Sequence, residues 1–154
     1  MRITVAAEPF DSAEAQRLIA ALDEHLASRY SADQRFGPNL RPEQVASGLG
    51  TFVIARAGGR AVGCGAMRRL DEATAEVKRM YVEPELRGQG IASEILDHLE
   101  AEARSIGMSR LVLETGIYQA EAIGLYRRMG FNPVRCWGEY EGVLTSVCFE
   151  KSIT

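Results

Sequence analysis

The residues best suited to chemistry in this sequence form one short, glycine-containing segment, Arg87-Gly88-Gln89-Gly90-Ile91-Ala92. It lies between a strand-like run and the start of an amphipathic helical pattern. Glycine lets the backbone approach a ligand closely and adopt torsion angles closed to other residues. The first N–H groups of the following helix are unpaired, and the helix dipole favours an anion there. The segment therefore predicts a cradle of backbone amides for a pyrophosphate, with Arg87 adding positive charge.

Two other interpretations of the glycines have to be weighed. An ordinary strand-to-helix turn also uses glycine, and Gly88-x-Gly90 matches part of the dinucleotide-binding pattern G-x-G-x-x-G. Against the second interpretation, Ser93 stands where the third glycine belongs, and the four residues 84–87 separate the strand from Gly88. Three antiparallel strands are also expected before the loop, which a doubly wound dinucleotide fold does not have.

Carboxylates and a tyrosine supply candidates for proton transfer. Glu76 lies near the start of the strand-like run 75–82, and Glu114 ends the run 110–114, where ligands gather in α/β sheets. Either could act as a general base, and a solvated carboxylate is the alternative for both. Tyr126 lies on the inner stripe of a helix expected over 119–129. Periodicity alone would make it a core aromatic.

The elements that must position these residues follow from periodicity and turn signals. Alternating or continuous apolar runs predict strands, and apolar residues at helical spacing predict helices. A capping box at Asp11 and Glu14 is expected to start the first helix. Strands are expected at 2–7, 51–57, 61–69, 75–82, 110–114, 132–139 and 143–151, with helices after Asp11, over 91–106 and over 119–129. We expect a single domain over residues 1–154, with one mixed α/β sheet and helices on its faces.

Composition excludes several classes of protein. A net charge of −3 over 154 residues argues against nucleic-acid binding. No apolar run approaches the ~20 residues that a membrane span needs, so we expect a cytoplasmic protein without a membrane partner. Three cysteines without a C-x-x-C pair predict free thiols and no zinc site. His25 and His98 are expected on separate helices as solvated or satisfied side chains, so no metal is expected.

Several segments resemble one family. The loop resembles the [Q/R]-x-x-G-x-[G/A] motif of the GCN5-related N-acetyltransferases (GNAT superfamily), and Leu125 to Phe131 match its L-Y-x-x-x-G-F pattern about 35 residues later. The segments 76–92, 111–116 and 122–131 resemble family segments in the right order. The resemblance implies a mostly antiparallel sheet with a central, splayed pair of parallel strands, and acetyl transfer from acetyl-CoA to an amine.

The resemblance also assigns roles. Tyr126 would protonate the leaving thiolate, and Glu76 would be the general base, with Glu114 or water left open. Gln119 stands where many relatives carry an asparagine that touches the cofactor. The resemblance implies that acetyl-CoA is held, largely through the main chain, by Met80, Tyr81, Val82, Arg87, Gly88, Gln89, Gly90, Ile91, Ala92, Ser93, Gln119 and Tyr126.

The acceptor is less well defined. From their place in the layout, the candidates that line its pocket are Tyr30, Phe36, Glu114, Glu139 and Tyr140. We expect the acceptor to be a primary amine of a small molecule or peptide, which receives the acetyl group directly in a ternary complex. O-acetylation and a longer acyl donor stay open. The alternative function is a non-catalytic, regulatory acyl-CoA-binding module of the same fold. Homodimers are common in the family, so a homodimer stays open.

Overall fold

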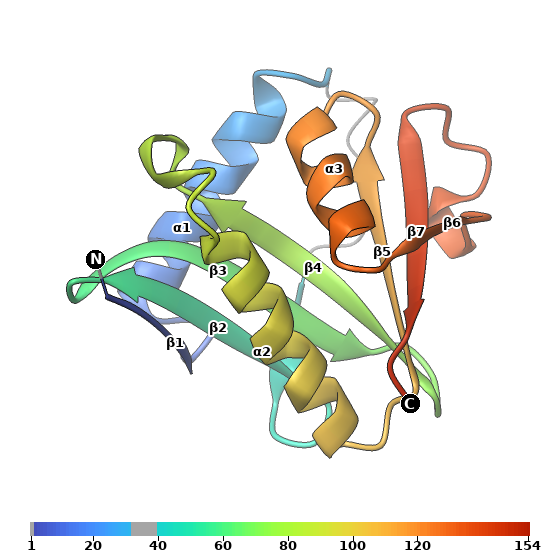
Figure 1. Ribbon diagram of the computed structural model, residues 1–154, viewed down its shortest axis with the longest axis horizontal. Coiled ribbons are helices and arrows are strands. Elements are labelled where there is room, and N and C mark those ends of the chain that lie inside the picture. Colours follow the sequence, from blue (N-terminus) through green and yellow to red (C-terminus); the bar gives the residue numbers. More distant parts are fainter. Residues whose placement is uncertain (1, 32–39) are drawn as a thin grey trace.

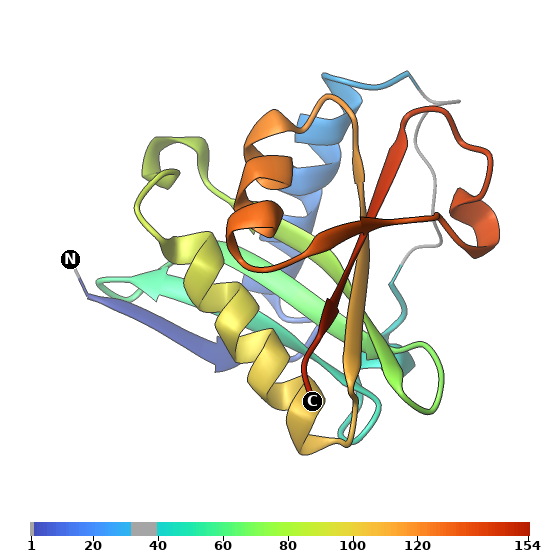
Figure 2. The same ribbon diagram turned by 45° about the vertical axis from the view of Figure 1, so that its right-hand side comes forward.

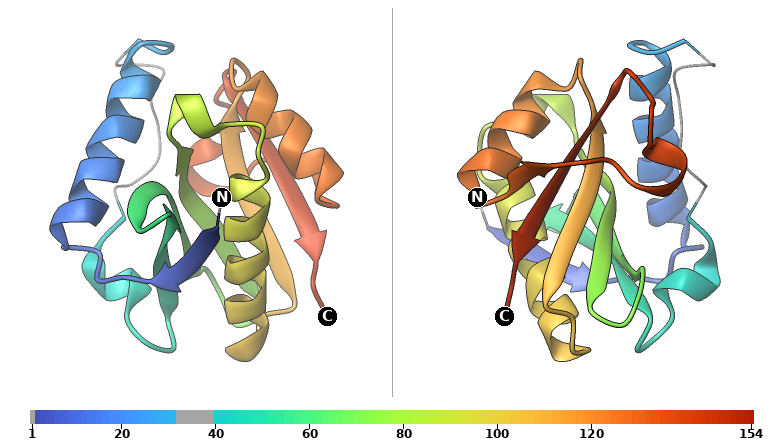
Figure 3. Two further views of the ribbon diagram at one scale, coloured as in Figure 1. Left: turned by 60° about the vertical axis from the view of Figure 1, so that its left-hand side comes forward. Right: turned by 90° about the vertical axis from the view of Figure 1, so that its right-hand side faces the viewer.

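A computed structural model describes residues 2–31 and 40–154, and its centre is a seven-stranded mixed sheet. The strand order is β1-β2-β3-β4-β5-β7-β6, and only β4 and β5 pair in parallel. Helix α1 covers one face, while α2 and α3 cover the other (Figures 1 and 3). The strands are β1 (Ile3–Ala7), β2 (Gly50–Ala57), β3 (Arg60–Arg69), β4 (Thr74–Val82), β5 (Arg110–Gly116), β6 (Asn132–Val134) and β7 (Ser146–Ser152). The α-helices are α1 (Ala13–Ala27), α2 (Ile91–Ser105) and α3 (Ala120–Arg128).

Two hydrophobic clusters hold these layers together. Helix α2 contributes Ile91, Ile95 and Leu99 to the larger cluster, which it shares with residues from both parallel strands. Helix α1 contributes Leu18 and Ile19 to a smaller cluster on the opposite face of the sheet. Both stripes follow the 3.6-residue period of an amphipathic helix, so burial of one face explains why each helix docks where it does. The predicted fold class is confirmed, including the central parallel pair.

The first half of the sheet is an antiparallel meander, as its turn signals predict. Gly58 and Gly59 connect β2 to β3 with φ angles of 58° and 87°, a region that glycine adopts at no steric cost. The chain then leaves β4 through the 3₁₀ turn η3 (Pro84–Leu86), runs down α2 and returns in β5. This crossover makes β4 and β5 parallel neighbours.

The structure differs from the expected element ends at several places; β7, for example, begins at Ser146 and not at position 143. Ser12, and not Asp11, caps α1, because its hydroxyl accepts a hydrogen bond from the Ala15 amide at 3.1 Å. The strand expected over 132–139 stops at Val134 and is followed by the 3₁₀ turn η4 (Gly138–Tyr140). Gly138 has a φ of 52°, which no extended strand accommodates. A further 3₁₀ turn, η2 (Pro42–Val45), precedes β2.

Two cysteines expected as free thiols form a disulfide. Cys136 follows β6 and Cys148 lies within β7, and their sulfur atoms are bonded. The odd number of cysteines and the missing C-x-x-C pattern did not indicate this pair. The two cysteines are 12 positions apart in the sequence and come together because β6 pairs with β7. Cys64 alone is free, and it is buried. None of the helices in the described ranges is long and apolar enough to cross a membrane.

The disulfide leads to a stability prediction. Closing a loop of this length lowers the entropy of the unfolded chain, which corresponds to about 3 kcal/mol. We expect Cys136→Ser to lower the melting temperature by about 6–12 °C, given about 2–4 °C per kcal/mol for a chain of this size.

Dithiothreitol should produce the same shift in the wild-type protein and none in the variant. Alkylation of unfolded, non-reduced protein should label one thiol. Three labelled thiols, or a wild-type melting temperature that dithiothreitol leaves unchanged, would contradict the bond.

Candidate active site

The site is built around an opening between β4 and β5. The two strands are in register at Thr74, Ala75 and Glu76, which face Arg110, Leu111 and Val112, and no further pairs follow. Beyond that point β4 slants away while β5 stays beside β7 (Figure 2). A bulge in β4 lies in the same stretch: the register with β3 shifts between Cys64 and Ala66, and Arg79 adopts a φ of 58°. Bulges bend and twist a strand, so this one turns β4 away from its neighbour.

The predicted cradle lies at the open end of β4. Gly88 and Gly90 have φ angles of 79° and 84°, and Gly90 precedes the first turn of α2. No side chain caps this helix. Within the described part of the chain, no backbone carbonyl accepts from the amides of residues 88–93. These N–H groups are therefore available to an anion, and the helix dipole reinforces the attraction.

A cavity of about 700 Å³ connects this loop with the opening between the strands. Its wall contains every residue predicted to hold the cofactor except Gln89, whose side chain is exposed. The opposite wall comes from α3, which contributes Tyr126 and Arg128. The loop, the splayed strand and α3 therefore line one continuous cavity.

The backbone of β4 offers hydrogen-bonding groups to this cavity. The Glu83 amide donates to the Val62 carbonyl on β3, with an N···O distance of 2.8 Å. Peptide groups alternate in direction along a strand, so the N–H and C=O of Val82 point the other way, into the opening. The Val82 carbonyl accepts from Nε of Arg87 at 2.9 Å. The Val82 amide is left facing the space where a ligand would lie.

Tyr126 reaches the cavity from the core. Its side chain is 6% exposed, and its ring packs against Phe131 and Phe149. Within the described residues no hydrogen-bond partner occupies its hydroxyl. Burial raises the pKa of the phenol, and the nearby charge of Glu114 raises it further. The phenol is therefore protonated at neutral pH and can act as a proton donor.

Gln119, which departs from the asparagine of many relatives, also lines the cavity. Its Oε1 atom is the one buried side-chain oxygen in residues 2–31 and 40–154 that has no hydrogen-bond partner. An unsatisfied buried acceptor is costly unless a partner arrives, so this atom points to a ligand that carries a hydrogen-bond donor.

Glu76 does not line the cavity; it lies at the base of the opening in a charged network. Nε and Nη2 of Arg68 lie 3.0 and 2.9 Å from its Oε1 atom. The Tyr140 hydroxyl donates to Oε2 at 2.9 Å, and Nζ of Lys78 lies 3.8 Å from the same oxygen. The carboxylate is 1% exposed. It is therefore neither the solvated side chain nor the open base that its position in the sequence suggests, because its lone pairs are already used.

Glu114 has a different environment on the neighbouring strand. Within the described residues its side chain has one hydrogen-bond partner, the Ser146 hydroxyl, which donates to Oε2 at 2.6 Å. Burial raises the pKa of Glu114, and the Glu76 charge adds to this, while Ser146 and Lys78 oppose it. A carboxylate with a raised pKa and free lone pairs suits a general base at neutral pH better than one held in an ion pair.

The predicted acceptor residues lie outside the cavity. Tyr30 is buried against the turn after β5, where its hydroxyl accepts from the Tyr118 amide at 3.0 Å. Tyr140 is buried beside Glu76, and Glu139 is exposed next to it. The charges of Glu114 and Glu139 both act on Tyr140, so these three groups are near one another. Phe36 lies outside the described residues.

Sequence reasoning missed a wall of the cavity that α1 supplies. Leu22 and His25 on α1 line it at a spacing of three residues, and Arg29 lines it two residues after the helix ends. A signal was present, since His25 and Arg29 continue the buried stripe of Leu18 and Leu22 with polar residues. Sequence reasoning also missed Lys78 and Arg68 as neighbours of Glu76. The signal available for them was a charged residue within an otherwise apolar strand.

Comparison with known proteins agrees with this geometry. Residues 15–131 match the sequence model of the acetyltransferase (GNAT) family. An IAA acetyltransferase of Azospirillum brasilense is 40% identical over 153 residues, which cover 98% of each chain. This chain belongs to the GNAT family of acetyltransferases.

Solved GNAT-type structures show the same fold. A candidate acyl-CoA N-acyltransferase from Klebsiella pneumoniae superimposes with a TM-score of 0.84 at 34% identity, covering 99% of this chain and 98% of that one. The PaiA N-acetyltransferase of Thermoplasma acidophilum, solved in complex with coenzyme A, gives a TM-score of 0.73 over 99% of both chains at 17% identity. The GNAT member described here is therefore an acyltransferase.

The cradle can be tested at Gly90. The family resemblance predicts that acetyl-CoA binds there, and a valine would be strained at a φ of 84° and would place its methyl groups in front of the amides. Losing two charge-assisted hydrogen bonds of about 1.5–3 kcal/mol each should weaken coenzyme A binding at least a hundredfold. Isothermal titration calorimetry of Gly90→Val measures this.

Gly107→Val is the matched control, because Gly107 at the other end of α2 has a φ of 86° and equally open space around it. It should carry the same backbone strain and keep wild-type affinity. Equal affinity of a folded Gly90→Val variant would contradict the cradle.

Proposed function

We propose that this protein is an acetyl-CoA-dependent N-acetyltransferase that acetylates a primary amine of a small molecule or peptide by direct transfer in a ternary complex. One observation carries the proposal: a single cavity is lined both by the loop with free backbone amides and by Tyr126. The first feature suits the phosphates of a cofactor, and the second suits a proton donor at its reactive end.

The residues present fit acetyl-CoA. The amides of residues 88–93 would hold the pyrophosphate, and Val82 with Met80 would offer backbone groups to the extended pantetheine arm. The orphaned Oε1 of Gln119 would accept from an amide N–H of that arm. Complexes of GNAT-fold neighbours with coenzyme A, such as the Thermoplasma protein, support the same assignment through the fold. When bound, acetyl-CoA supplies an acetyl group activated as a thioester.

The acceptor amine must lose a proton before it can attack. For an alkylammonium with a pKa near 10.4, this costs about 4.6 kcal/mol at pH 7, at 1.36 kcal/mol per pH unit. We propose that Glu114 accepts this proton, because its pKa is raised and a single hydroxyl is its hydrogen-bond partner. Glu76, the base expected from the sequence, is engaged by Arg68 and Tyr140. We propose that Glu76 instead holds the residues at the base of the acceptor site in place.

Transfer then forms one C–N bond and breaks one C–S bond. The Val82 amide faces the opening and would stabilise negative charge on the carbonyl oxygen, as in other acyl-transfer sites. Tyr126 would return a proton to the sulfur as it leaves. Direct transfer is favoured over a covalent cysteine route, because burial raises the pKa of the Cys64 thiol to about 12 and Cys148 is bonded to Cys136.

The acceptor face of the site lies across the sheet from α2. Leu111 and Leu113 belong to the core beneath α2, and side chains alternate along a strand, so Glu114 faces the other side. The carboxylate of Glu114 on this face suits a cationic amine. The Azospirillum brasilense relative is named an IAA acetyltransferase, which supports a small molecule as the acceptor.

A non-catalytic acyl-CoA-binding module is the second candidate function. Such a module would need the amide cradle. It would need neither a Tyr126 hydroxyl without a protein partner nor a Glu114 carboxylate with a raised pKa. Release of free coenzyme A thiol from acetyl-CoA with a panel of amines decides between the two. No release above the rate in buffer with any amine would favour the binding module.

Tyr126→Phe tests the proton donor. The ring packing against Phe131 and Phe149 stays, and only a hydroxyl without a protein partner is removed. We expect acetyl-CoA affinity within a few-fold of wild type and a kcat reduced at least tenfold, or about 1.4 kcal/mol in the barrier, because the proton is needed only in the transition state. Steady-state kinetics at saturating acetyl-CoA, with calorimetric binding, provide both numbers.

Tyr118→Phe serves as the control, since Tyr118 is 49% exposed and does not line the cavity. It should leave kcat and melting temperature unchanged. A Tyr126→Phe enzyme with wild-type kcat would make Tyr126 a packing residue and leave solvent as the acid.

A pair of substitutions, Glu114→Gln and Glu76→Gln, assigns the base. Loss of a general base typically costs about 10²–10⁴ in rate. We expect Glu114→Gln to show this loss near neutral pH and to recover as pH approaches the pKa of the acceptor amine, which then deprotonates without help. Glu76→Gln should instead lower the melting temperature and reduce the rate by a constant factor, because the Arg68 charge loses its partner.

The pH–rate profile of kcat/KM for both variants is the measurement. If the profile recovers at high pH for Glu76→Gln and not for Glu114→Gln, Glu76 is the base. If neither variant shows recovery, water carries the proton.

A further inference from the structure

Helix α1 packs against β3 and β4 on the face of the sheet away from α2 (Figure 3). Near its middle, Asp23 accepts from Nη1 of Arg79 in the β4 bulge at 2.8 Å. At its C-terminal end, Nη1 of Arg29 donates to the Tyr118 carbonyl at 3.1 Å, in the turn between β5 and α3. The C-terminal part of the helix is thus attached to β4 and, through a residue just after the helix, to the turn that follows β5. One of the residues between these two attachments lines the cavity.

His25 occupies that position and lines the cavity with Leu22 and Arg29. Within the described residues its imidazole has no hydrogen-bond partner. Across the cavity from α1 stand the loop of free amides and Arg87, and α3 closes the remaining side with Glu121 and Arg128. An unpartnered imidazole is thus placed in the same cavity as the surface that attracts anions.

The charges around His25 come from three elements. Burial lowers the pKa of His25, and the charges of Arg87 in the loop and of Arg29 just after α1 lower it further. Glu121 on α3 opposes them. The imidazole is therefore mostly neutral at neutral pH in the free protein. Unlike an arginine, it can take up a proton when an anion enters the cavity.

We propose that His25 is a phosphate-contacting residue of this cavity that takes up a proton when the coenzyme A moiety binds, so that cofactor affinity rises as pH falls. The inference rests on the proposed function, because it takes coenzyme A as the ligand. It adds α1 to the elements that hold the cofactor and makes binding responsive to pH.

The direction of the pH dependence follows from the linkage between proton binding and cofactor binding. Phosphate anions stabilise the imidazolium, so the pKa of His25 is higher in the complex than in the free protein. The gain in affinity is complete below the free pKa and disappears as pH rises through the pKa of the complex. Each unit of difference between the two pKa values corresponds to about a tenfold change in affinity.

Calorimetric titration in buffers of different ionisation enthalpy counts the protons taken up. The probe is dephospho-coenzyme A, which lacks the 3′-phosphate, a group that would itself titrate in this range. At pH 7 we expect the wild-type protein to take up a fraction of a proton and to bind about tenfold more tightly at pH 6 than at pH 8.5. His25→Gln should bind without uptake and with little dependence on pH.

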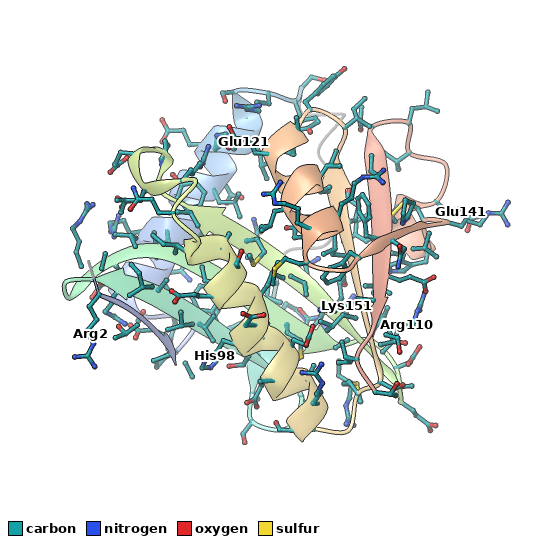
Figure 4. The ribbon with its side chains drawn as sticks, in the orientation of Figure 1. Arg2, His98, Arg110, Glu121, Glu141 and Lys151 are labelled. Carbon is teal, nitrogen blue, oxygen red and sulfur yellow. A yellow bond between two sulfur atoms is a disulfide. The ribbon has the colours of Figure 1, made fainter. Side chains whose placement is uncertain are left out.

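The chain provides a matched control, because its second histidine, His98, lies on α2 and does not line the cavity. Figure 4 places His98 along α2, well away from Glu121 at the start of α3. His98→Gln should retain the uptake and pH dependence of the wild type.

The outcomes separate the two proposals. If the wild-type protein binds without proton uptake, or His25→Gln retains the uptake, the role of His25 is overturned while the proposed function stands. If neither dephospho-coenzyme A nor acetyl-CoA binds the wild-type protein, the proposed function and the role of His25 both fall.

Discussion

The early end of the parallel pairing between β4 and β5 is the constraint on which the site depends. After Glu76 and Val112 the strands no longer exchange hydrogen bonds, although both continue for several residues. Backbone N–H and C=O groups need partners, so those facing the opening are satisfied by water or by an extended ligand. The β4 bulge at Arg79 turns the strand away, and the cradle follows where β4 ends. The cavity is therefore a direct consequence of an incomplete sheet.

Contacts on the other face of the sheet hold the opening in place. Helix α1 is attached to β4 through Asp23 and to the turn after β5 through Arg29. A change in the separation of the strands would break one of these contacts or displace the helix. The N-terminal helix is thus mechanically linked to the cofactor cavity, even though the residues recognised as family motifs all lie after position 75.

Burial and hydrogen bonding give two similar carboxylates different properties. Glu76 faces Arg68 in the neighbouring strand and is nearly inaccessible, so its charge is already compensated. Glu114 accepts a hydrogen bond from one hydroxyl, and burial raises its pKa. The first arrangement stabilises the base of the opening, because removing one partner of a buried ion pair is costly. The second arrangement leaves carboxylate lone pairs free, which is why we propose Glu114 as the general base.

The sequence by itself determined the elements and the cradle, because both depend on local signals. Periodicity predicts α2 and the strands on either side of it, and Gly88 with Gly90 specifies backbone angles that no distant residue has to supply. Tertiary structure alone decided the partners of Glu76, the Cys136–Cys148 bond and the place of His25 on the cavity wall. Each of these depends on how segments far apart in the chain align: Tyr140 reaches Glu76 across 64 residues. A local pattern shows which face of an element is buried, whereas its contacts are set by register and packing of the whole sheet.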